Sequence, residues 1–324
     1  MSQLILNAIG DIEANTELVE APDLTVGVGE ALVRIEAAAI NPVDFMLAAG
    51  TYGYQAQVPF ALGSEGVGRV VESGDPELQG RRVLIVPNYQ QGTWADEVVV
   101  KAENLVVIPD EGDALQLAMV GINPLTAHLL LTEFVDLKPG DWIGQNLGNS
   151  SVGQYVIGLA KHLGLKTVSA VRREEAAAKL RALGADVVVV DGEDLAGRIK
   201  QRLDGAELKL ALDGTGDATI GALAQAVEFG GTVVSYSSVT GQPPVVGLGD
   251  SIYRQLTLRG LWIVNWLSTA SKAELDKTYT ELAAMVASGV LSLEVGATYS
   301  LADYRKAWDH AREAGRDGKI LFRP

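Results

Sequence analysis

The chain has 324 residues, a formal net charge of −15 at pH 7, 48% hydrophobic residues and no cysteine. This length allows two domains of ordinary size, and the apolar runs are far too short to cross a membrane. The lack of cysteine excludes disulfides and thiolate zinc sites, and the acidic balance without a basic run argues against a nucleic-acid partner.

Residues up to about 110 predict a domain rich in β-strands. Short apolar stretches alternate with turns that contain Gly, Pro and Asp, a spacing typical of a compact barrel. The expected strands cover 31–40, 66–74, 81–87, 94–101 and 105–109.

From about residue 115, helices and strands alternate. A helical stretch with a break at Pro124 leads through a turn at 138–141 into a strand that begins at Trp142. Further strands, with helices between them, are expected at 166–171, 186–191, 208–214, 232–237 and 256–263. Apolar strands that alternate with helices predict an α/β fold with a doubly wound parallel sheet, the Rossmann arrangement.

The tail predicts helices at 271–288 and 302–314, with a strand-like stretch at 293–301 between them and the segment 316–324 after them. By its pattern alone this tail fits either domain. No basic and apolar leader opens the sequence, so we expect a cytoplasmic protein. The three histidines lack ligand-like spacing, so we expect no metal site; they are His128, His162 and His310.

The segment QNLGNSSVGQ, at 145–154, connects the first strand of this sheet to the next helix. At such a turn, backbone N–H groups and the helix dipole favour a phosphate, and glycines let the backbone approach it. The alternative is an ordinary loop between a strand and a helix. The residues expected to bind a dinucleotide are Gly148, Asn149, Ser150, Ser151, Val152 and Gly153.

Two arginines follow the second strand and indicate which dinucleotide fits. Arg172 and Arg173 suit a 2′-phosphate, so NADPH is favoured over NADH. The alternative is a solvated helix start in which Glu174 and Glu175 pair with these arginines. A further cofactor contact is expected from Tyr236-Ser237, because this pair ends the fifth strand, where the crevice of such sheets lies.

Several motifs in order resemble the medium-chain dehydrogenase/reductase superfamily over nearly the whole chain. Gly63-Ser64-Glu65 matches the stretch that carries Gly-His-Glu in its zinc enzymes, so both catalytic zinc ligands are missing and the chain resembles a zinc-free member. Within that group it is similar to mitochondrial-type trans-2-enoyl-thioester reductases, although Ser151 replaces a glycine and Gly148 a serine of their cofactor turn. The matching segments are INPVDFMLAAGTYG (40–53), GINPLTAHLLL (121–131), PGDWIGQNLGNSSVGQ (139–154) and LRGLWIVNW (258–266).

The resemblance implies a GroES-like catalytic domain over 1–116, an NADPH-binding Rossmann domain over 117–262 and a return to the catalytic domain over 263–324. It implies reduction of the 2,3-double bond of a trans-2-enoyl thioester, with hydride added to C3 and a proton to C2. That reaction needs hydrogen-bond donors for the enolate oxygen and a proton source, but no strong base. The alternatives are a zinc-free quinone or enone reductase and a protein that binds NADPH without turnover.

Six further residues acquire roles through the resemblance. It makes Tyr52 the proton or enolate donor, since a phenol with a reference pKa of about 10 stays protonated at pH 7, and Tyr54 is the rival. Asn41 and Thr126 match positions that line the nicotinamide, with ordinary turn and cap roles as the alternative. Tyr54, Trp262 and Trp266 are expected in the acyl pocket, where the alternative is plain packing.

The expected partners are an acyl-thioester substrate and a second copy of the chain. Relatives commonly pair through the edge strand of the cofactor domain, here 256–263, so a homodimer is expected. Asp44 is expected near the cofactor turn or as a local helix cap. An acyl-carrier-protein substrate would need a basic docking patch, for which the candidates are Arg305, Lys306, Arg312, Arg316, Lys319 and Arg323.

Overall fold

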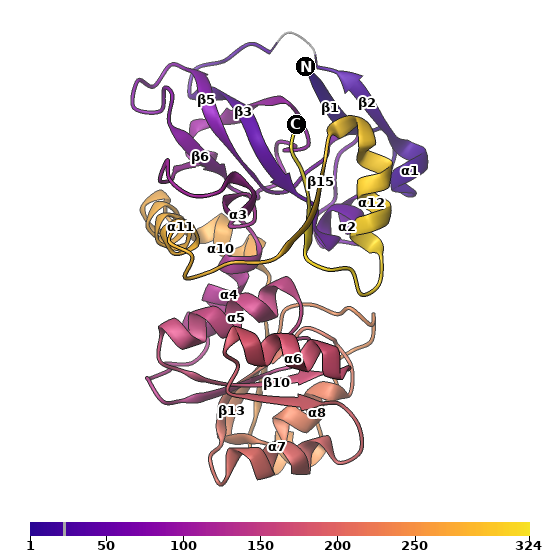
Figure 1. The fold of residues 1–324 in the computed structure, drawn as a ribbon, viewed down its shortest axis with the longest axis vertical. Helices are drawn as coiled ribbons and strands as arrows, with labels where there is room; N and C mark the ends of the chain where they lie inside the picture. The colour runs from indigo at the N-terminus through magenta and orange to yellow at the C-terminus, as the bar shows by residue number, and fades with distance from the viewer. Residues whose placement is uncertain (22–23) are drawn as a thin grey trace. The chain divides into compact units, whose positions relative to one another are not determined.

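The computed structural model, which describes residues 1–21 and 24–324, separates the chain into two units. The first unit comprises Met1–Ile122 and Val264–Pro324, and the second comprises Asn123–Ile263. Figure 1 accordingly shows the C-terminal helix α12 and the N-terminal strands in the same unit. Of the helices that the structure describes, none is both long and apolar enough to cross a membrane.

The first unit is built on two sheets. A seven-stranded sheet has the order β15-β16-β3-β5-β6-β8, with β7 also paired to β3, and a small sheet has the order β2-β1-β4. The strands of the larger sheet are β3 (Glu30–Ala39), β5 (Gly66–Ser73), β6 (Arg82–Ile85), β7 (Glu97–Lys101), β8 (Leu105–Val107), β15 (Val295–Tyr299) and β16 (Lys319–Phe322). Those of the small sheet are β1 (Ser2–Leu6), β2 (Thr16–Glu20) and β4 (Phe60–Ala61).

Helices of the first unit cover these sheets and enclose one apolar core. That core contains buried Trp94 and Trp308, whose ring centroids lie 5.8 Å apart. The strands and helices before residue 30 were not predicted, because short segments of mixed polarity carry little periodic signal. The helices are α1 (Ile12–Asn15), α2 (Pro42–Ala49), η1 (Ala102–Asn104), α3 (Ala114–Leu117), α11 (Lys272–Ala287), η2 (Leu301–Asp303) and α12 (Tyr304–Arg312).

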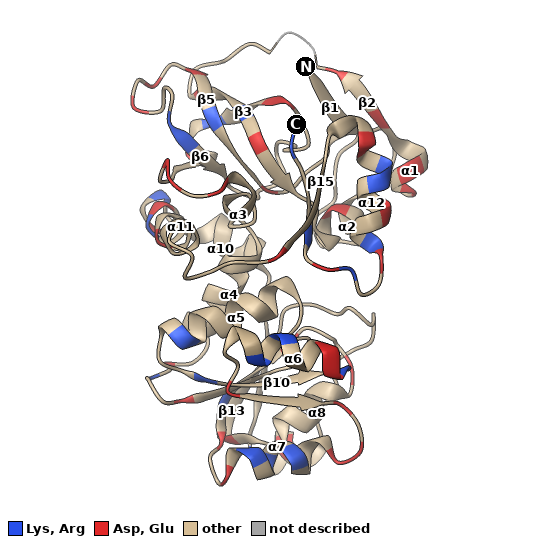
Figure 2. Cartoon of the chain, in the orientation of Figure 1, with Lys and Arg blue, Asp and Glu red and all other residues tan. Residues whose placement is uncertain are grey.

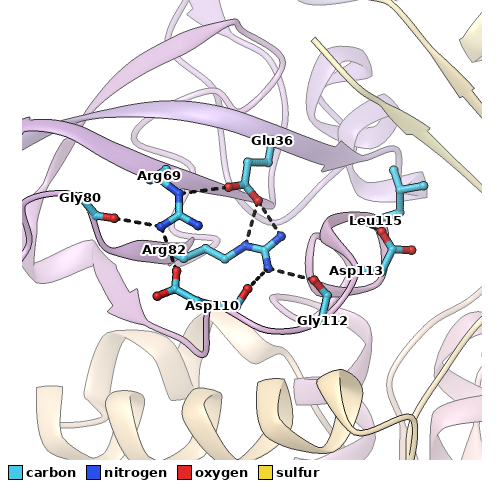
Figure 3. Close-up of polar contacts among 8 residues, drawn as sticks. All are labelled: Glu36, Arg69, Gly80, Arg82, Asp110, Gly112, Asp113 and Leu115. Atoms are coloured by element: carbon cyan, nitrogen blue, oxygen red, sulfur yellow. Dashed lines mark hydrogen bonds and ion pairs between the residues drawn. The ribbon is translucent and has the colours of Figure 1, made fainter.

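A buried arginine ties the strands of the larger sheet to the loop that follows β8. Figure 3 shows the guanidinium of Arg82 between the Glu36 carboxylate and the carbonyl oxygens of Asp110 and Gly112. Arg82 Nη2 lies 2.6 Å from Glu36 Oε2, and each carbonyl accepts from Nη1 over 2.9 Å. Since a buried charge requires such compensation, this network holds the path of the chain from the sheet toward α3.

The second unit contains the doubly wound parallel sheet that the sequence predicts. Its strand order is β11-β10-β9-β12-β13-β14, and every neighbouring pair is parallel. The strands are β9 (Trp142–Gln145), β10 (Lys166–Val171), β11 (Val187–Val190), β12 (Leu208–Asp213), β13 (Val227–Ser235) and β14 (Thr257–Gly260). The helices are α4 (Asn123–Thr132), α5 (Ser151–His162), α6 (Glu174–Leu183), α7 (Leu195–Leu203), α8 (Thr219–Ala224) and α9 (Leu248–Tyr253).

Several predicted boundaries differ from the structure, and three of them concern the second unit and its ends. The helix expected to break at Pro124 is two helices, α3 and α4, and this proline lies in the first turn of α4, where it is tolerated. The fifth strand ends at Ser235, so Tyr236 follows it. The strand expected over 256–263 stops at Gly260, and helix α10 (Ile263–Thr269) begins inside the same apolar run, which periodicity alone could not resolve.

Candidate functional site

In the second unit, the turn between β9 and α5 packs tightly against the helix that it precedes. Leu147 has a left-handed backbone with φ of 56°, and Ser150 caps α5 because its Oγ accepts a hydrogen bond of 3.1 Å from Gly153 N. A Cβ on Gly153 would lie 2.6 Å from the carbonyl oxygen of Gly148, so a larger residue would push the turn away. The helix N-terminus beside this turn can hold a phosphate on its backbone N–H groups.

Asn146 joins the loops that follow two neighbouring strands, β9 and β12. Its Nδ2 donates to Asp213 Oδ1 over 2.8 Å and to Thr215 Oγ1 over 2.6 Å, while its Oδ1 accepts from Gly214 N over 2.7 Å. The direction of winding reverses between these two strands, which is where open α/β sheets bind ligands. The sequence reasoning missed this network, although a polar residue at the end of each apolar strand was a signal for it.

Tyr236 presents a polar atom that lacks a partner in the structure. Its Oη is buried, and no described residue completes a hydrogen bond to it. Burial raises the pKa of this phenol to about 12; the nearby Ser150 hydroxyl opposes the rise, although it completes no hydrogen bond of good geometry with Tyr236, and the Asp213 carboxylate adds to it. A Cβ on Gly214 would lie 2.5 Å from this Oη, so the glycine makes room for the phenol. An orphaned buried hydroxyl of this kind can bind a polar group of a ligand. The next residue, Ser237, is exposed.

The two arginines after β10 are exposed cations. Neither Arg172 nor Arg173 forms an ion pair with a described residue. The alternative is a solvated helix start with Glu174 and Glu175 as partners. Both arginines are exposed at the start of α6, but Glu174 pairs with Arg181, with Oε1 and Nη1 2.5 Å apart. The charge of Arg172 also acts on the Asp217 carboxylate, and both guanidinium groups are accessible to an anionic group of a ligand.

In the first unit, three tyrosines from two loops pack together. Tyr52 and Tyr54 lie on the loop before β4, and Tyr89 lies on the loop between β6 and β7. Tyr52 Oη lies 3.3 Å from Tyr89 Oη, and Tyr54 Oη donates to the carbonyl oxygen of Tyr89 over 3.5 Å. Tyr89 is buried, whereas the other two are partly exposed. The candidate donor Tyr52 thus pairs with a second phenol that the sequence reasoning missed.

A buried polar cluster lies close to these loops in sequence and joins α2, the approach to β5, and β16. Asp44 accepts from Asn41 N over 2.7 Å and from Ser64 Oγ over 2.6 Å. Asn41 Nδ2 donates to Glu65 Oε1 over 2.7 Å, and Lys319 Nζ donates to Asn41 Oδ1. All five side chains are at most 4% exposed. We call these residues the buried ionisable cluster.

Burial dominates the ionisation of this cluster. It raises the pKa of Asp44 to about 6, against the hydrogen bonds from Ser64 and Asn41 and the charge of Lys319. It likewise raises the pKa of Glu65 above its ordinary value, opposed by the Lys319 charge and the Asn41 amide. For the Lys319 ammonium, burial lowers the pKa, and Glu65 opposes that change. The two carboxyls and the ammonium therefore depend on one another for their charged forms.

The remaining predicted site residues are divided between the units. Asn41 is the N-cap residue of α2, and its side-chain amide forms hydrogen bonds within the buried ionisable cluster. The Asp44 side chain caps the start of the same helix by accepting from the backbone N–H of Asn41, the local cap role that the sequence allowed. Thr126 is a buried residue of α4 in the second unit. Trp262 immediately precedes α10 and Trp266 lies in it, and both are partly buried.

Comparisons with known proteins agree with this architecture. Residues 27–110 match the family described as "Alcohol dehydrogenase GroES-like domain", and residues 151–284 match the one described as "Zinc-binding dehydrogenase". The human protein named "Enoyl-[acyl-carrier-protein] reductase, mitochondrial" is 32% identical over 94% of this chain and 83% of its own length.

Two solved structures are similar over the whole of this chain. A putative NADPH:quinone reductase from Bacillus thuringiensis is 25% identical, with a TM-score of 0.90 and 98% of its own chain covered. A mycobacterial protein complexed with NADPH is also 25% identical, with a TM-score of 0.85 and 100% of its own chain covered.

The residues of this chain do not fit the zinc that one family description implies. The described residues contain no group of three or more His, Cys, Asp or Glu that could hold a metal, and the chain has no cysteine. Ser64, at the position where zinc enzymes have a histidine, donates its hydroxyl to Asp44 instead. The Lys319 ammonium lies in the same cluster, and its positive charge opposes a second cation there.

Proposed function

Because the chain belongs to the zinc-free enoyl-thioester reductases of the medium-chain dehydrogenase/reductase superfamily, we propose that it reduces the 2,3-double bond of trans-2-enoyl thioesters with NADPH. The observation that carries this proposal is the match over 94% of the chain to the human enoyl-[acyl-carrier-protein] reductase. The two candidate regions support it, since one suits a dinucleotide and the other presents a phenol that can donate a proton.

NADPH, which supplies a hydride to C3 of the substrate when bound, would be held by the second unit. The turn Gly148–Gly153, with Asn149, Ser151 and Val152 between its ends, receives the pyrophosphate at the N-terminus of α5. Arg172 and Arg173 bind the 2′-phosphate, which distinguishes NADPH from NADH. The orphaned Oη of Tyr236 supports this assignment, and the neighbouring Ser237 is the other contact proposed on that side.

Tyr52 of the first unit is the proposed proton donor. As hydride arrives at C3, the electron pair of the double bond moves toward the thioester carbonyl, and C2 then takes a proton. The Tyr52 O–H bond breaks as the C2–H bond forms, and water restores the proton to the phenol oxygen afterwards. The Tyr54 hydroxyl already donates to a backbone carbonyl, which makes it the weaker candidate.

The other residues have supporting roles in this proposal. Asn41, the N-cap residue of α2, acts through the buried ionisable cluster, and Thr126 of the second unit is proposed to line the nicotinamide. Tyr54, Trp262 and Trp266 line the acyl pocket. Asn41 and Thr126 are each buried within their own unit, and Tyr54, Trp262 and Trp266 are partly buried.

We propose a coenzyme A thioester rather than an acyl-carrier protein as the substrate. Figure 2 shows acidic residues on and beside α12, the helix that carries three of the six candidate docking cations. Lys306 pairs with Asp303, and Arg312 pairs with Glu13 and Asp309. Counting Lys319 among surface cations was wrong, because it is buried. Two of the six cations are therefore neutralised by neighbouring carboxylates and a third is buried, which weakens a docking patch for an acidic carrier protein.

The test is to mix the purified protein with NADPH and crotonyl-CoA and follow the loss of nicotinamide absorbance. We expect faster turnover with crotonyl-CoA than with a simple quinone, and Tyr52→Phe to lower kcat while NADPH binding is retained. A quinone reductase is the second candidate, favoured by the likeness to the Bacillus thuringiensis structure. Equal or faster turnover of quinone would favour it. No turnover with either acceptor would favour a binding role.

We also propose a homodimer that forms through β14 at the edge of the sheet. All four residues of this strand are exposed, and apolar side chains gather on it and on α9, as an uncovered interface would. Those side chains are Leu248, Ile252, Tyr253 and Leu258. Light scattering should give twice the monomer mass, and Leu258→Arg should halve it.

The cytoplasm stays our predicted location. Because the relatives are named mitochondrial, fractionation of cells is the test of this prediction.

A further inference from the structure

Tyr89 is held in place by its backbone, by burial and by two neighbouring rings. Its φ of 60° lies in the left-handed region, which residues with a Cβ rarely adopt, and its side chain is 3% exposed. The ring centroids of Tyr52 and Tyr54 lie 5.7 Å and 5.4 Å from its own. These constraints determine where its hydroxyl lies, which is 3.3 Å from the hydroxyl of Tyr52.

The surroundings of this hydroxyl keep it protonated. Burial raises the pKa of the Tyr89 phenol far above its ordinary value, and the Tyr52 phenol and the carboxyls of Asp44 and Glu65 add to the rise. A phenol that does not ionise in the working pH range always has a hydrogen to donate, and its oxygen does not become a phenolate. In the pair of phenols, Tyr89 is therefore suited to donate and Tyr52 to accept.

We propose that Tyr89 is a positioning residue for Tyr52, donating its hydroxyl hydrogen to Tyr52 Oη so that the Tyr52 proton is directed away from Tyr89. This inference rests on the proposed function, in which the Tyr52 proton moves to C2 of the substrate. The electron pair of the broken O–H bond stays on Tyr52 Oη. The hydrogen bond from Tyr89 strengthens as that oxygen becomes charged, because charged acceptors form stronger hydrogen bonds.

The experiment compares the full-length wild type with Tyr52→Phe, Tyr89→Phe and the double variant, using NADPH and crotonyl-CoA. We expect Tyr89→Phe to lower kcat about 10- to 100-fold, as for loss of one donor to a developing charge, with less than about twofold change in KM. In the Tyr52→Phe background the second substitution should have no effect, because Tyr89 acts only through Tyr52. A merely structural role would not produce that dependence.

The matched control is Tyr304→Phe. Tyr304 is another buried tyrosine of the first unit, and its hydroxyl donates to the carbonyl oxygen of Thr16 over 3.4 Å. Loss of the Tyr304 hydroxyl should leave kcat unchanged. Urea unfolding gives the folded fraction of each protein, so that kcat can be calculated for folded enzyme alone. Tyr89→Met provides a second variant that lacks the Tyr89 hydroxyl.

The outcomes separate this inference from the function on which it rests. Wild-type kcat in Tyr89→Phe or Tyr89→Met overturns the inference, as does a double variant whose loss is the product of the single losses. In both cases an active wild type leaves the proposed function standing. If the wild type reduces neither crotonyl-CoA nor other enoyl thioesters, the proposed function fails, and the role of Tyr89 fails with it.

Discussion

Substitution of Lys319 by Met removes the one cation of the buried ionisable cluster. The carboxyls of Glu65 and Asp44 then remain buried without their opposite charge, and Asn41 Oδ1 loses its donor. Breaking a buried ion pair on one side costs about 3–5 kcal/mol, and leaving a buried carbonyl unsatisfied costs about 1–3 kcal/mol. Burial lowers the pKa of Lys319 to about 8, so the ammonium is largely charged at pH 7. At pH 7 we expect the variant to lose about 3–5 kcal/mol of the free energy of unfolding, with the lost hydrogen bond included.

The loss should depend on pH in a defined direction. Without Lys319, the pKa of Glu65 in the folded state rises further above its value in the unfolded chain. A raised folded pKa contributes stability that is complete below the unfolded pKa and is lost as pH rises through the folded pKa. The amount is about 1.4 kcal/mol for each pH unit that separates the two pKa values. At pH 5 only the broken hydrogen bond remains, so we expect a loss of about 1–2 kcal/mol.

Urea unfolding at pH 5 and pH 7 measures both values, and the fluorescence of tryptophans that include Trp94 and Trp308 of the same unit reports the unfolding. Adding Glu65→Gln should restore much of the stability at pH 7, because no uncompensated charge then remains at that position. The control is Lys306→Met, which breaks an exposed pair and should leave the urea midpoint nearly unchanged. An equal loss at both pH values would refute the proposed origin of the effect.

Three other variants test the proposed cofactor site and the fold. Arg172→Ala with Arg173→Ala should raise the Kd of NADPH about 10- to 100-fold and leave that of NADH nearly unchanged, as titration of nicotinamide fluorescence would detect. Gly153→Ala should weaken NADPH binding at least about tenfold in the same titration, because its Cβ would meet the Gly148 carbonyl at 2.6 Å. Arg82→Met should cost about 3–5 kcal/mol in urea unfolding, because its buried carboxylate and carbonyl partners lose their donor.

Matched controls make these results decisive. Gly74→Ala places a Cβ in open space and should leave NADPH binding unchanged. Arg69→Met removes a half-exposed arginine of the same network and should cost less than about 1 kcal/mol. Equal effects of the control and the test substitution, or an unchanged preference for NADPH over NADH, would contradict the roles given to the tested residues.

Periodic segments were predictable because their burial repeats along the chain. The helix expected at 271–288 is Lys272–Ala287, and the strand expected at 166–171 has those bounds in the structure. The turn between β9 and α5 was also predictable, because its glycines and serines stand between an apolar strand and an amphipathic helix. Boundaries failed where one apolar run passes from strand to helix, as at Gly260 and Ile263.

By itself, the sequence determined the class of fold and excluded a thiolate zinc site, because the first depends on the repeat of apolar residues along the chain and the second on residue composition. Only the tertiary structure decided which groups share an environment. Lys319 is separated from Asn41 by most of the chain, yet β16 pairs with β3 and brings the two together. Tyr89 and Tyr52 meet in the same way, from different loops. Burial and long-range pairing set their ionisation and hydrogen bonds, and no local pattern of residues encodes either.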